Sequence, residues 1–304
     1  MYPDAPSQGT GYPQEGQAPP RGQAPPRGQA TSKGTGSPKG QATGLGYPLG
    51  TGYRFGARLR DRLPCKLEPA AADREIGGMQ WSARDLARHI DHTLLKPEAR
   101  AADIARLCAE ALEHQFWSVC VHGSRVAQAA ALLEGSEVKL AAVVGFPLGA
   151  MDGDAKRYET EVAIDLGAQE IDMVLNIGRL KDGDDRAVLR EIRDVVEAAQ
   201  GVWVKVILET CLLSEDEKLR ACSLSVEAGA RFVKTSTGFS SGGATVEDIR
   251  LMRQAVGSAL GVKASGGIRD TATALAMLEA GANRLGTSAG VAIVSGHAAA
   301  VGGY

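Results

Sequence analysis

The chain has 304 residues, of which 44% are hydrophobic and 23% are charged, and its formal net charge is −2 at pH 7. These values are typical of a water-soluble globular protein, and they give no reason to expect nucleic acid or an anionic membrane as a partner. No apolar stretch is long enough to cross a bilayer, and the N-terminus lacks the basic-then-apolar order of a secretory signal, which favours a cytoplasmic protein.

Residues 1–60 differ in composition from the rest of the chain. They hold nine of the thirteen prolines and the direct repeat GQAPPRGQAPPRGQ, and their seven basic residues outnumber two acidic ones. Apolar residues are too sparse there to offset the entropy of ordering the backbone. We therefore predict a disordered extension and linker over 1–75, followed by one domain over 76–304. The extension is either a weak interaction or localisation tail or, as we favour, dispensable.

From Trp81 onward, short apolar runs alternate with longer amphipathic stretches. The runs predict eight strands, at 89–93, 117–122, 140–146, 170–175, 203–209, 232–235, 262–264 and 284–286. Several helical stretches between them end in Gly-Ala, which suits a glycine C-cap before a short loop. Because the strand hydrophobicity is continuous rather than alternating, both faces of the sheet are expected to be covered. The pattern predicts an α/β fold, a closed (β/α)8 TIM barrel; a doubly wound open sheet is the structural alternative.

Three charged residues stand inside otherwise apolar predicted strands: Asp172, Lys234 and Lys263. Polar residues at the C-terminal ends of barrel strands are usually functional, because the active site of this fold is built there. A buried charge without a partner is unfavourable, so these residues either pair with one another or are kept for reactivity. For one lysine alone, a salt-bridged or solvent-reaching side chain is an equally good interpretation. Two lysines on consecutive strands, with an acid two strands earlier, favour catalysis.

The spacing of the two lysines indicates what that catalysis is. Lys234 and Lys263 are separated by about one helix-plus-strand repeat, so their strands should be neighbours, and adjacent strands lie about 4.8 Å apart. At an effective dielectric constant near 20, repulsion between two such close ammonium groups is worth roughly 3 kcal/mol and lowers the pKa of one of them by about two units. The neutral amine that results can attack a carbonyl carbon.

Asp172 is predicted to move protons in that reaction, because forming and dehydrating a carbinolamine moves protons on and off one oxygen. A structural counter-ion to Lys263 is the simpler alternative, and the two roles are compatible. Glu170 faces the same way as Asp172 if the strand is regular, and it is a candidate for a supporting hydrogen bond. Asp91, in the first predicted strand, is a candidate partner for a substrate hydroxyl.

Anion-binding features follow the last three predicted strands. Loops after the seventh and eighth strands are the usual phosphate site of a barrel, where backbone N–H groups approach the anion. The candidates are glycines and hydroxyl residues: Thr235, Ser236, Thr237, Gly238, Gly266, Gly267, Gly286, Thr287 and Ser288. Tight turns explain most such glycines when each is considered alone. Three such loops in succession favour a phosphorylated small molecule as the substrate.

Other kinds of site find no support. The five cysteines make an odd count without a CxxC pair, which argues against a disulfide framework and a Cys-based zinc site. The five histidines form no HExxH or HxH motif, so we expect no metal ion. No GxGxxG follows the first predicted strand, and no cofactor is expected. Cys120 lacks an adjacent base, which favours a core or pocket-lining thiol over a nucleophile.

Eight segments resemble the deoxyribose-phosphate aldolase family, in family order and spacing: HIDHTLLKP (89–97), VCV (119–121), VVGFPLG (143–149), GAQEIDMVLNIG (167–178), VKVILET (204–210), AGARFVKTSTGF (228–239), VKASGGIR (262–269) and RLGTSAG (284–290). The resemblance extends from about Trp81 to His297, and KTSTG with the following KASGG is its specific part. It implies a metal-free enzyme that cleaves 2-deoxy-D-ribose 5-phosphate reversibly to acetaldehyde and D-glyceraldehyde 3-phosphate.

The resemblance also implies roles for single residues. Lys234 matches the lysine that forms a Schiff base with the substrate. Asp172 and Lys263 match residues that relay protons and tune that lysine. Gly266, Gly267 and Ser288 match phosphate-loop positions, and Asp91 matches a residue near the substrate hydroxyls.

The sequence departs from the family pattern at a few positions. His122 and Gly123 end the second strand, where an Asn-Pro or Tyr-Pro type ending is expected. Phe239 and Ala289 replace a lysine and a serine that some members carry. Tyr304 is terminal, like the mobile tyrosine of the best-known members, but it lies on a short tail.

Two rival interpretations stay open. One is a metal-free isomerase on a phosphate-binding barrel, which would form no covalent adduct with an aldehyde. The other is a non-catalytic barrel whose task is binding through residues 1–60. Barrel enzymes of this size are frequently dimers, so a homodimer is one expectation, although no segment of the sequence identifies an interface.

Overall fold

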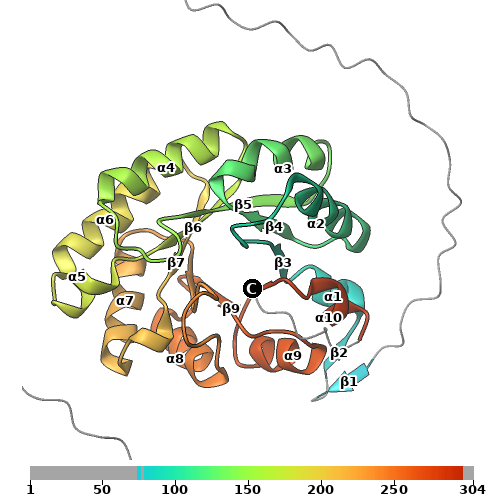
Figure 1. The fold of residues 1–304 in the computed structure, drawn as a ribbon. Helices are drawn as coiled ribbons and strands as arrows, with labels where there is room; N and C mark the ends of the chain where they lie inside the picture. The colour runs from blue at the N-terminus through green and yellow to red at the C-terminus, as the bar shows by residue number, and fades with distance from the viewer. Residues whose placement is uncertain (1–73, 77–78, 297–304) are drawn as a thin grey trace, which may run out of the picture. The chain divides into compact units, whose positions relative to one another are not determined.

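Eight parallel strands close into a barrel in the computed structural model, which describes residues 74–76 and 79–296 (Figure 1). The strands are β3 (Ile90–Thr93), β4 (Ser118–Val121), β5 (Lys139–Val144), β6 (Glu170–Val174), β7 (Trp203–Ile207), β8 (Phe232–Lys234), β9 (Gly261–Ser265) and β10 (Arg284–Thr287). They pair in chain order, and β10 pairs with β3 to close the circle. Each strand overlaps a predicted apolar run, so the predicted (β/α)8 barrel is confirmed and the open sheet is excluded.

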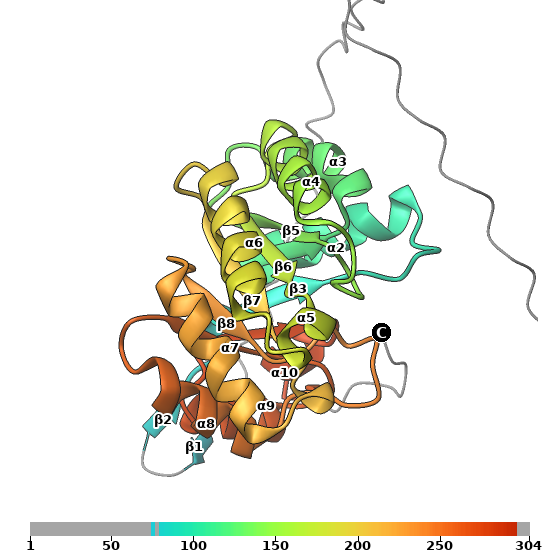
Figure 2. The same cartoon turned by 90° about the vertical axis from the view of Figure 1, so that its left-hand side faces the viewer.

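Helices cover the outside of the barrel, and at least one follows each strand (Figure 1). They are α1 (Ala83–Ala87), α2 (Ala101–His114), α3 (Val126–Leu133), α4 (Gly153–Asp165), α5 (Ile177–Lys181), α6 (Asp185–Ala198), α7 (Glu215–Glu227), α8 (Val246–Val256), α9 (Thr271–Glu279) and α10 (Gly290–Val294), with short 3-10 helices η1 (Gly123–Arg125) and η2 (Thr210–Leu212). The side view shows α6 and α7 next to each other across the outer surface (Figure 2). This packing of helices on strands explains why the strands carry apolar residues on their outer face.

Side chains along each strand alternate between the barrel interior and the layer beneath the helices. In β6, Ile171 and Met173 belong to the large apolar core between strands and helices, whereas Glu170 and Asp172 meet other charged groups inside the barrel. On β4 and on β5, the strand next to β6, the interior is apolar, and a separate small cluster is formed there by Cys120, Ala141 and Val143 together with Leu95. The interior therefore has an apolar side, on β4 and β5, and a charged side, on the remaining strands.

Helix ends are defined by local hydrogen bonds that the sequence provides. Ser214 and Glu217 form a capping box at the start of α7. The predicted Gly-Ala ends are confirmed: the N–H groups of Ala168, Ala230 and Ala282 each donate to a carbonyl five residues earlier. The glycine before Ala168 has a φ of 108°, which a residue with a side chain rarely adopts. These ends set where the following strand begins.

A short hairpin precedes the barrel. The strands β1 (Arg74–Ile76) and β2 (Met79–Trp81) pair antiparallel across the predicted boundary between the extension, 1–75, and the domain, 76–304. Residues 1–73 of that extension lie outside the described residues, as does Tyr304, so the predictions made for them stay predictions. In the part of the chain that the structure describes, no helix is long and apolar enough to span a bilayer.

A buried ion pair ties the loop after β5 to α6. The Nζ atom of Lys156 in α4 lies 2.6 Å from Oε1 of Glu191, and it donates to the carbonyl oxygens of Gly149 at 2.7 Å and Val174 at 2.8 Å. Lys156 has no exposed surface. Because Val174 ends β6, this single ammonium group positions the end of the strand that carries Asp172.

Replacing Lys156 with methionine is expected to lower the free energy of unfolding by about 3–5 kcal/mol, because Glu191 is left as a buried charge without its partner. The double variant Lys156→Met/Glu191→Leu should recover most of that loss. Urea denaturation measures both values. The neighbouring Arg157→Met is the matched control, because its ion pair with Glu161 is exposed and should change stability by less than about 1 kcal/mol. Equal effects of Lys156→Met and Arg157→Met would contradict the positioning role.

Candidate active site

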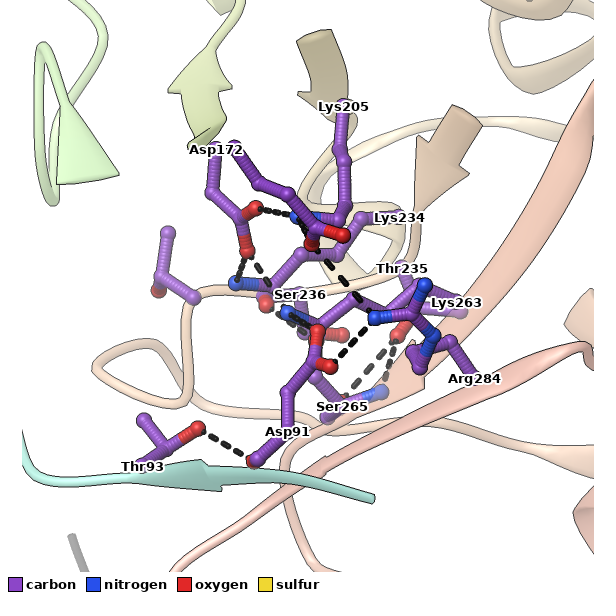
Figure 3. A network of polar contacts seen from close by, with 12 residues as sticks. Asp91, Thr93, Asp172, Lys205, Lys234, Thr235, Ser236, Lys263, Ser265 and Arg284 are labelled. Carbon is purple, nitrogen blue, oxygen red and sulfur yellow. Dashed lines mark hydrogen bonds and ion pairs between the residues drawn. The ribbon is translucent and has the colours of Figure 1, made fainter. Parts of the chain in front are cut away.

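Strand register brings the three predicted catalytic residues together inside the barrel (Figure 3). Lys234 at the end of β8 is paired with Lys263 of β9, and both amines donate to Oδ2 of Asp172, at 2.9 and 2.7 Å. Since they share one oxygen, the two nitrogens are no farther apart than the sum of these distances. All three residues are buried. The two lysines are thus close neighbours, as their spacing in the sequence predicted.

Four further charged residues join Asp172 and Lys263 in a closed circuit of alternating charge, which we call the charge ring: Asp172, Lys205, Glu170, Arg284, Asp91 and Lys263. Figure 3 labels all of its members except Glu170. Lys205 Nζ lies 2.6 Å from Asp172 Oδ1 and 2.6 Å from Glu170 Oε2. Arg284 Nη1 lies 3.4 Å from the same Glu170 oxygen and 2.6 Å from Asp91 Oδ1. Lys263 Nζ, at 2.5 Å from Asp91 Oδ2, completes the ring. No member is more than 3% exposed.

Lys234 is the cation outside the charge ring. The ring itself holds three carboxylates and three cations, so Lys234 adds a fourth positive charge to a site that is already balanced. Each ring cation contacts two carboxylates, whereas Lys234 contacts only Asp172 among the described residues. An uncompensated buried charge is unfavourable. Lys234 is therefore the amine that this site most readily deprotonates.

The pKa of Lys234 is accordingly held below its ordinary value. Burial is the largest cause; Asp172 opposes it, and repulsion from Lys263 adds to it. The sequence predicted repulsion between the lysines as the source of this shift. Burial has the larger effect, because the amine lies inside a closed barrel whose far wall is apolar. A lowered pKa makes the neutral amine available nearer to neutral pH, as attack on a carbonyl requires.

The other two lysines hold their protons. Burial disfavours the ammonium group of Lys263, but the attraction of Asp172 and Asp91 is stronger and raises the pKa of Lys263 above its usual range. Asp172 is likewise the main attraction that raises the pKa of Lys205 against the effect of burial. Burial also disfavours ionised Asp172, but the three surrounding ammonium positions hold its pKa well below the usual range. In the resting site the carboxylate is therefore ionised and is free to accept a proton, while the protons available for transfer sit on Lys205 and Lys263.

Two ring members, Lys205 and Arg284, are missing from the sequence-based prediction. The signal for Lys205 is the same as for the other lysines, because it is a lone charge in the apolar run VWVKVIL. Arg284 opens a predicted strand, a place that solvated arginines also take, so its sequence signal is weak. Only the contacts with Asp91 and Glu170, which lie on strands far from Arg284 in the sequence, identify it.

The two acids that the sequence placed in supporting roles are both in the charge ring. Glu170 also accepts a hydrogen bond from Trp117 Nε1 at 2.9 Å, so its predicted supporting role fits these contacts. Asp91 is fully buried, and its two oxygens face Arg284 and Lys263. A contact between Asp91 and a substrate hydroxyl stays a prediction.

The threonines of the predicted phosphate loop use their hydroxyls within the protein. Thr235 Oγ1 donates to the carbonyl oxygen of Ser265 and accepts from its N–H, both at 3.1 Å. Thr237 Oγ1 donates to Glu209 and accepts from the N–H of Phe239 at 3.1 Å. These bonds link the loop after β8 to the loop after β7 and to the end of β9. The side chains of Thr235 and Thr237 thus support the loop, and their predicted contact with an anion stays a prediction.

The remaining loop residues lie close to one another. Gly238 and Gly266 both have a positive φ, and a Cβ added to Gly266 would lie 3.6 Å from the Gly238 Cα. Gly267 and Ser288 are exposed, and no described residue accepts a hydrogen bond from the backbone N–H of either one. Gly286 is instead buried, where an added Cβ would meet Lys263 Cε at 3.0 Å. Three of the predicted loops are therefore brought together, while Gly286 makes room for the lysine.

The thiol of Cys120 near the amines is not activated as a nucleophile. Cys120 is fully buried in the small interior cluster, and burial raises the pKa of its thiol to about 11. That environment is the pocket-lining or core position that the sequence favoured. Across residues 74–76 and 79–296, no group of three or more His, Cys, Asp or Glu side chains is arranged to hold a metal ion.

Known proteins resemble this chain in sequence and in fold. Residues 86–296 match the family described as DeoC/LacD family aldolase. The deoxyribose-phosphate aldolase of Alkaliphilus oremlandii is 60% identical over 221 residues, which cover 72% of this chain and 100% of that protein. The one from Exiguobacterium sibiricum is 62% identical over 213 residues, which cover 70% of this chain and 96% of its own.

Solved structures agree with the sequence matches. A putative deoxyribose-phosphate aldolase from Coccidioides immitis has a TM-score of 0.69 and 42% identity, and the match covers 75% of this chain and 87% of that one. The deoxyribose phosphate aldolase from Aeropyrum pernix, described as a unique tetramer, has a TM-score of 0.66 and 35% identity, covering 70% and 91% of the two chains. The resemblance predicted from the sequence motifs is thereby confirmed, and the chain belongs to the DeoC/LacD family of aldolases.

Proposed function

We propose that this aldolase cleaves 2-deoxy-D-ribose 5-phosphate reversibly to acetaldehyde and D-glyceraldehyde 3-phosphate, through a Schiff base on Lys234. The observation that carries the proposal is the position of Lys234, which lies outside a balanced ring of charges and contacts a single carboxylate. Its proton is therefore the one most easily lost among the described lysines of the cluster. The names of relatives that are 60% identical over their full length support the choice of substrate.

In the cleavage direction, the neutral amine of Lys234 attacks the aldehyde carbon, C1, of the open-chain sugar. A C–N bond forms, the π electron pair moves to the oxygen, and the oxygen takes a proton. After the nitrogen loses one proton and the oxygen gains a second, water leaves and an iminium ion remains. Lys263 and Lys205 are the acids for these steps, since both carry protons, and Asp172 contacts all three amines and can relay a proton between them.

The iminium ion then accepts the electrons of the bond that breaks. The C3 hydroxyl loses its proton, the C2–C3 bond cleaves, and its electron pair forms an enamine, so that D-glyceraldehyde 3-phosphate leaves. Protonation of C2 and addition of water to the iminium ion release acetaldehyde and restore the Lys234 amine. No external oxidant or reductant is needed, because every electron pair returns to carbon, nitrogen or oxygen within the cycle.

The 5-phosphate is placed over the loops after β8, β9 and β10. Gly238, Gly266 and Gly267 offer backbone that an anion can approach closely, and Ser288 adds an exposed hydroxyl. The N–H groups of Gly267 and Ser288, which have no acceptor among the described residues, are the favoured donors. Thr235 and Thr237 act indirectly in this arrangement, by holding the loop after β8.

Reductive trapping tests the Schiff base. Brief treatment with dilute acetaldehyde and cyanoborohydride is expected to attach one ethyl group to Lys234, which peptide mass spectrometry locates. Because burial lowers the pKa of this amine, trapping should proceed well below the ordinary lysine value of 10.5 and should slow as the pH falls through the pKa of Lys234. The exposed Lys181 is the internal control, and it should carry no ethyl group after the same brief treatment. Absence of any adduct would favour the metal-free isomerase, and an adduct on Lys263 would reassign the nucleophile.

A cytoplasmic location and a homo-oligomeric assembly are part of the same proposal. Free thiols at Cys108, Cys120, Cys211 and Cys222 fit a reducing compartment. The tetrameric relative from Aeropyrum pernix supports association of identical chains, of which a dimer is the simplest form. Light scattering after size exclusion measures the mass of the assembly.

A further inference from the structure

We propose that Arg284 is a positioning residue for the same reaction, which closes the charge ring and thereby leaves Lys234 as the one surplus cation of the site. The inference rests on the proposed function, because it concerns how the Schiff-base lysine is kept unprotonated. Arg284 has no direct contact with Lys234. It acts through Asp91 and Glu170, because it neutralises part of the negative charge that would otherwise compensate the lysines.

Arg284 holds these two carboxylates at close range. Its Nη1 atom donates to Asp91 Oδ1 at 2.6 Å and to Glu170 Oε2 at 3.4 Å, and all three residues are buried. Asp91 and Glu170 are also the second carboxylates of Lys263 and Lys205. Arg284 therefore shares Asp91 with Lys263 and shares Glu170 with Lys205. Asp172 is then the only carboxylate of the cluster that contacts Lys205, Lys263 and Lys234 together.

An aromatic layer fixes the guanidinium in this place. Its Cζ atom lies 4.3 Å from the ring centroid of Trp117 and 5.5 Å from that of Phe232. Trp117 in turn stacks on Trp203 and donates to Glu170. A guanidinium group suits this position because it stacks on aromatic faces and does not lose its proton in proteins. Arg284 is thus the ring cation whose charge is permanent.

Arg284 determines whether the cationic groups of the cluster outnumber its carboxylates. With it, the cluster holds four cationic groups, Arg284, Lys205, Lys234 and Lys263, against three carboxylates, Asp91, Glu170 and Asp172. One proton must be absent for the buried cluster to be neutral, and Lys234 gives it up because it has the fewest carboxylate contacts. Without Arg284, three lysines would match three carboxylates, and protonated Lys234 would be compensated.

The remaining titratable groups around Lys234 do not alter this count. Cys120, on β4, has a pKa raised to about 11 and is neutral near pH 7. Glu209, after β7, is buried, and its carboxyl is hydrogen bonded to the side chain and N–H of Thr237. Among the described residues, Glu209 forms no ion pair with Arg284 or with any of the three lysines, so it lies outside the counted cluster.

The test is the pH dependence of acetaldehyde trapping on Lys234 in full-length variants, with kcat and KM measured alongside. The acid limb is the part of the pH profile in which the trapping rate falls as Lys234 becomes protonated. In Arg284→Met this limb should move to a pH about one unit higher, so that the rate at a fixed pH on the limb is about tenfold lower. In Glu170→Gln, where a carboxylate is removed instead, the limb should move down. The double variant Arg284→Met/Glu170→Gln again has one surplus cation, and its limb should return toward that of the unmodified protein.

Two controls separate charge from packing. Arg284→Lys keeps the charge and should leave the limb in place. Trp117→Phe removes the hydrogen bond to Glu170 while keeping every charge, and it should leave the limb in place as well. Circular dichroism checks the fold of each variant, and if Arg284→Met does not fold, the downward shift of Glu170→Gln decides the matter.

Each outcome has a separate meaning. If the unmodified protein forms no adduct on Lys234, the proposed function fails. If it does form the adduct but the limb stays unmoved in Arg284→Met and Glu170→Gln, only the inference about Arg284 is overturned. A fall in kcat with an unshifted limb would assign Arg284 a purely structural role, which also overturns the inference.

Discussion

Lys234→Ala is expected to reduce aldolase turnover by about 10⁵-fold or more, the scale seen when a covalent nucleophile is removed from an enzyme. The reason is that the amine forms the bond on which every later step depends, and the other two lysines of the buried cluster, Lys205 and Lys263, each pair with two carboxylates. The charge ring explains why the fold should survive. Without Lys234, three carboxylates and three cations remain, so no buried charge loses its only partner. The measurement is steady-state cleavage of 2-deoxy-D-ribose 5-phosphate, coupled to detection of D-glyceraldehyde 3-phosphate.

Two further variants make that result specific. Lys234→Met fills the volume of the side chain without its amine, and it should be as inactive as Lys234→Ala. Lys181→Ala, on the exposed helix α5, should keep full activity. Residual cleavage within about 100-fold of the unmodified protein in either Lys234 variant, about 3 kcal/mol of the barrier, would move the nucleophile elsewhere.

Asp172→Asn is expected to lower kcat by about 10²–10⁴-fold, as expected when a general acid–base group is lost. The carboxylate contacts three amines, and an amide cannot accept and return protons among them. The same variant should lose about 3–5 kcal/mol of stability, because Lys205 and Lys263 each keep only one carboxylate. Kinetics and urea denaturation on the same preparation measure both effects. A change in KM with an unaltered kcat would contradict the proton-relay role.

The stability difference between the unmodified protein and Asp172→Asn has a defined pH dependence. The pKa of Asp172 is lower in the folded protein than the ordinary 3.8, so its contribution is fully present above about pH 3.8 and is lost only as the pH falls through the lower folded value. The advantage of the unmodified protein over Asp172→Asn should therefore persist at about pH 5. Asp154→Asn, at an exposed carboxylate, should show no such advantage at any pH.

Much of the fold follows from local patterns in the sequence. The apolar runs, the Gly-Ala helix ends and the capping serines act over a few residues, so they can be identified without knowing which strands meet. The same holds for Lys234, Lys263 and Asp172, because a lone charge in an apolar run is visible in one dimension. Lys205 carries that signal too. It could have been predicted in the same way, since its residue type and its apolar neighbours are the same.

The charge ring depends on contacts that no local pattern contains. Arg284 and Asp91 are 193 residues apart and meet because β10 pairs with β3 when the barrel closes. The roles of the loop threonines depend on Glu209, in the loop after β7, and on Ser265, at the end of β9. The amino-acid pattern alone was enough to predict the barrel and the two lysines and one acid that lie together inside it. Only the folded structure decides that Lys234 contacts one carboxylate while Lys205 and Lys263 contact two each. The physical reason is that closure of the barrel and the strand register determine which buried charges meet.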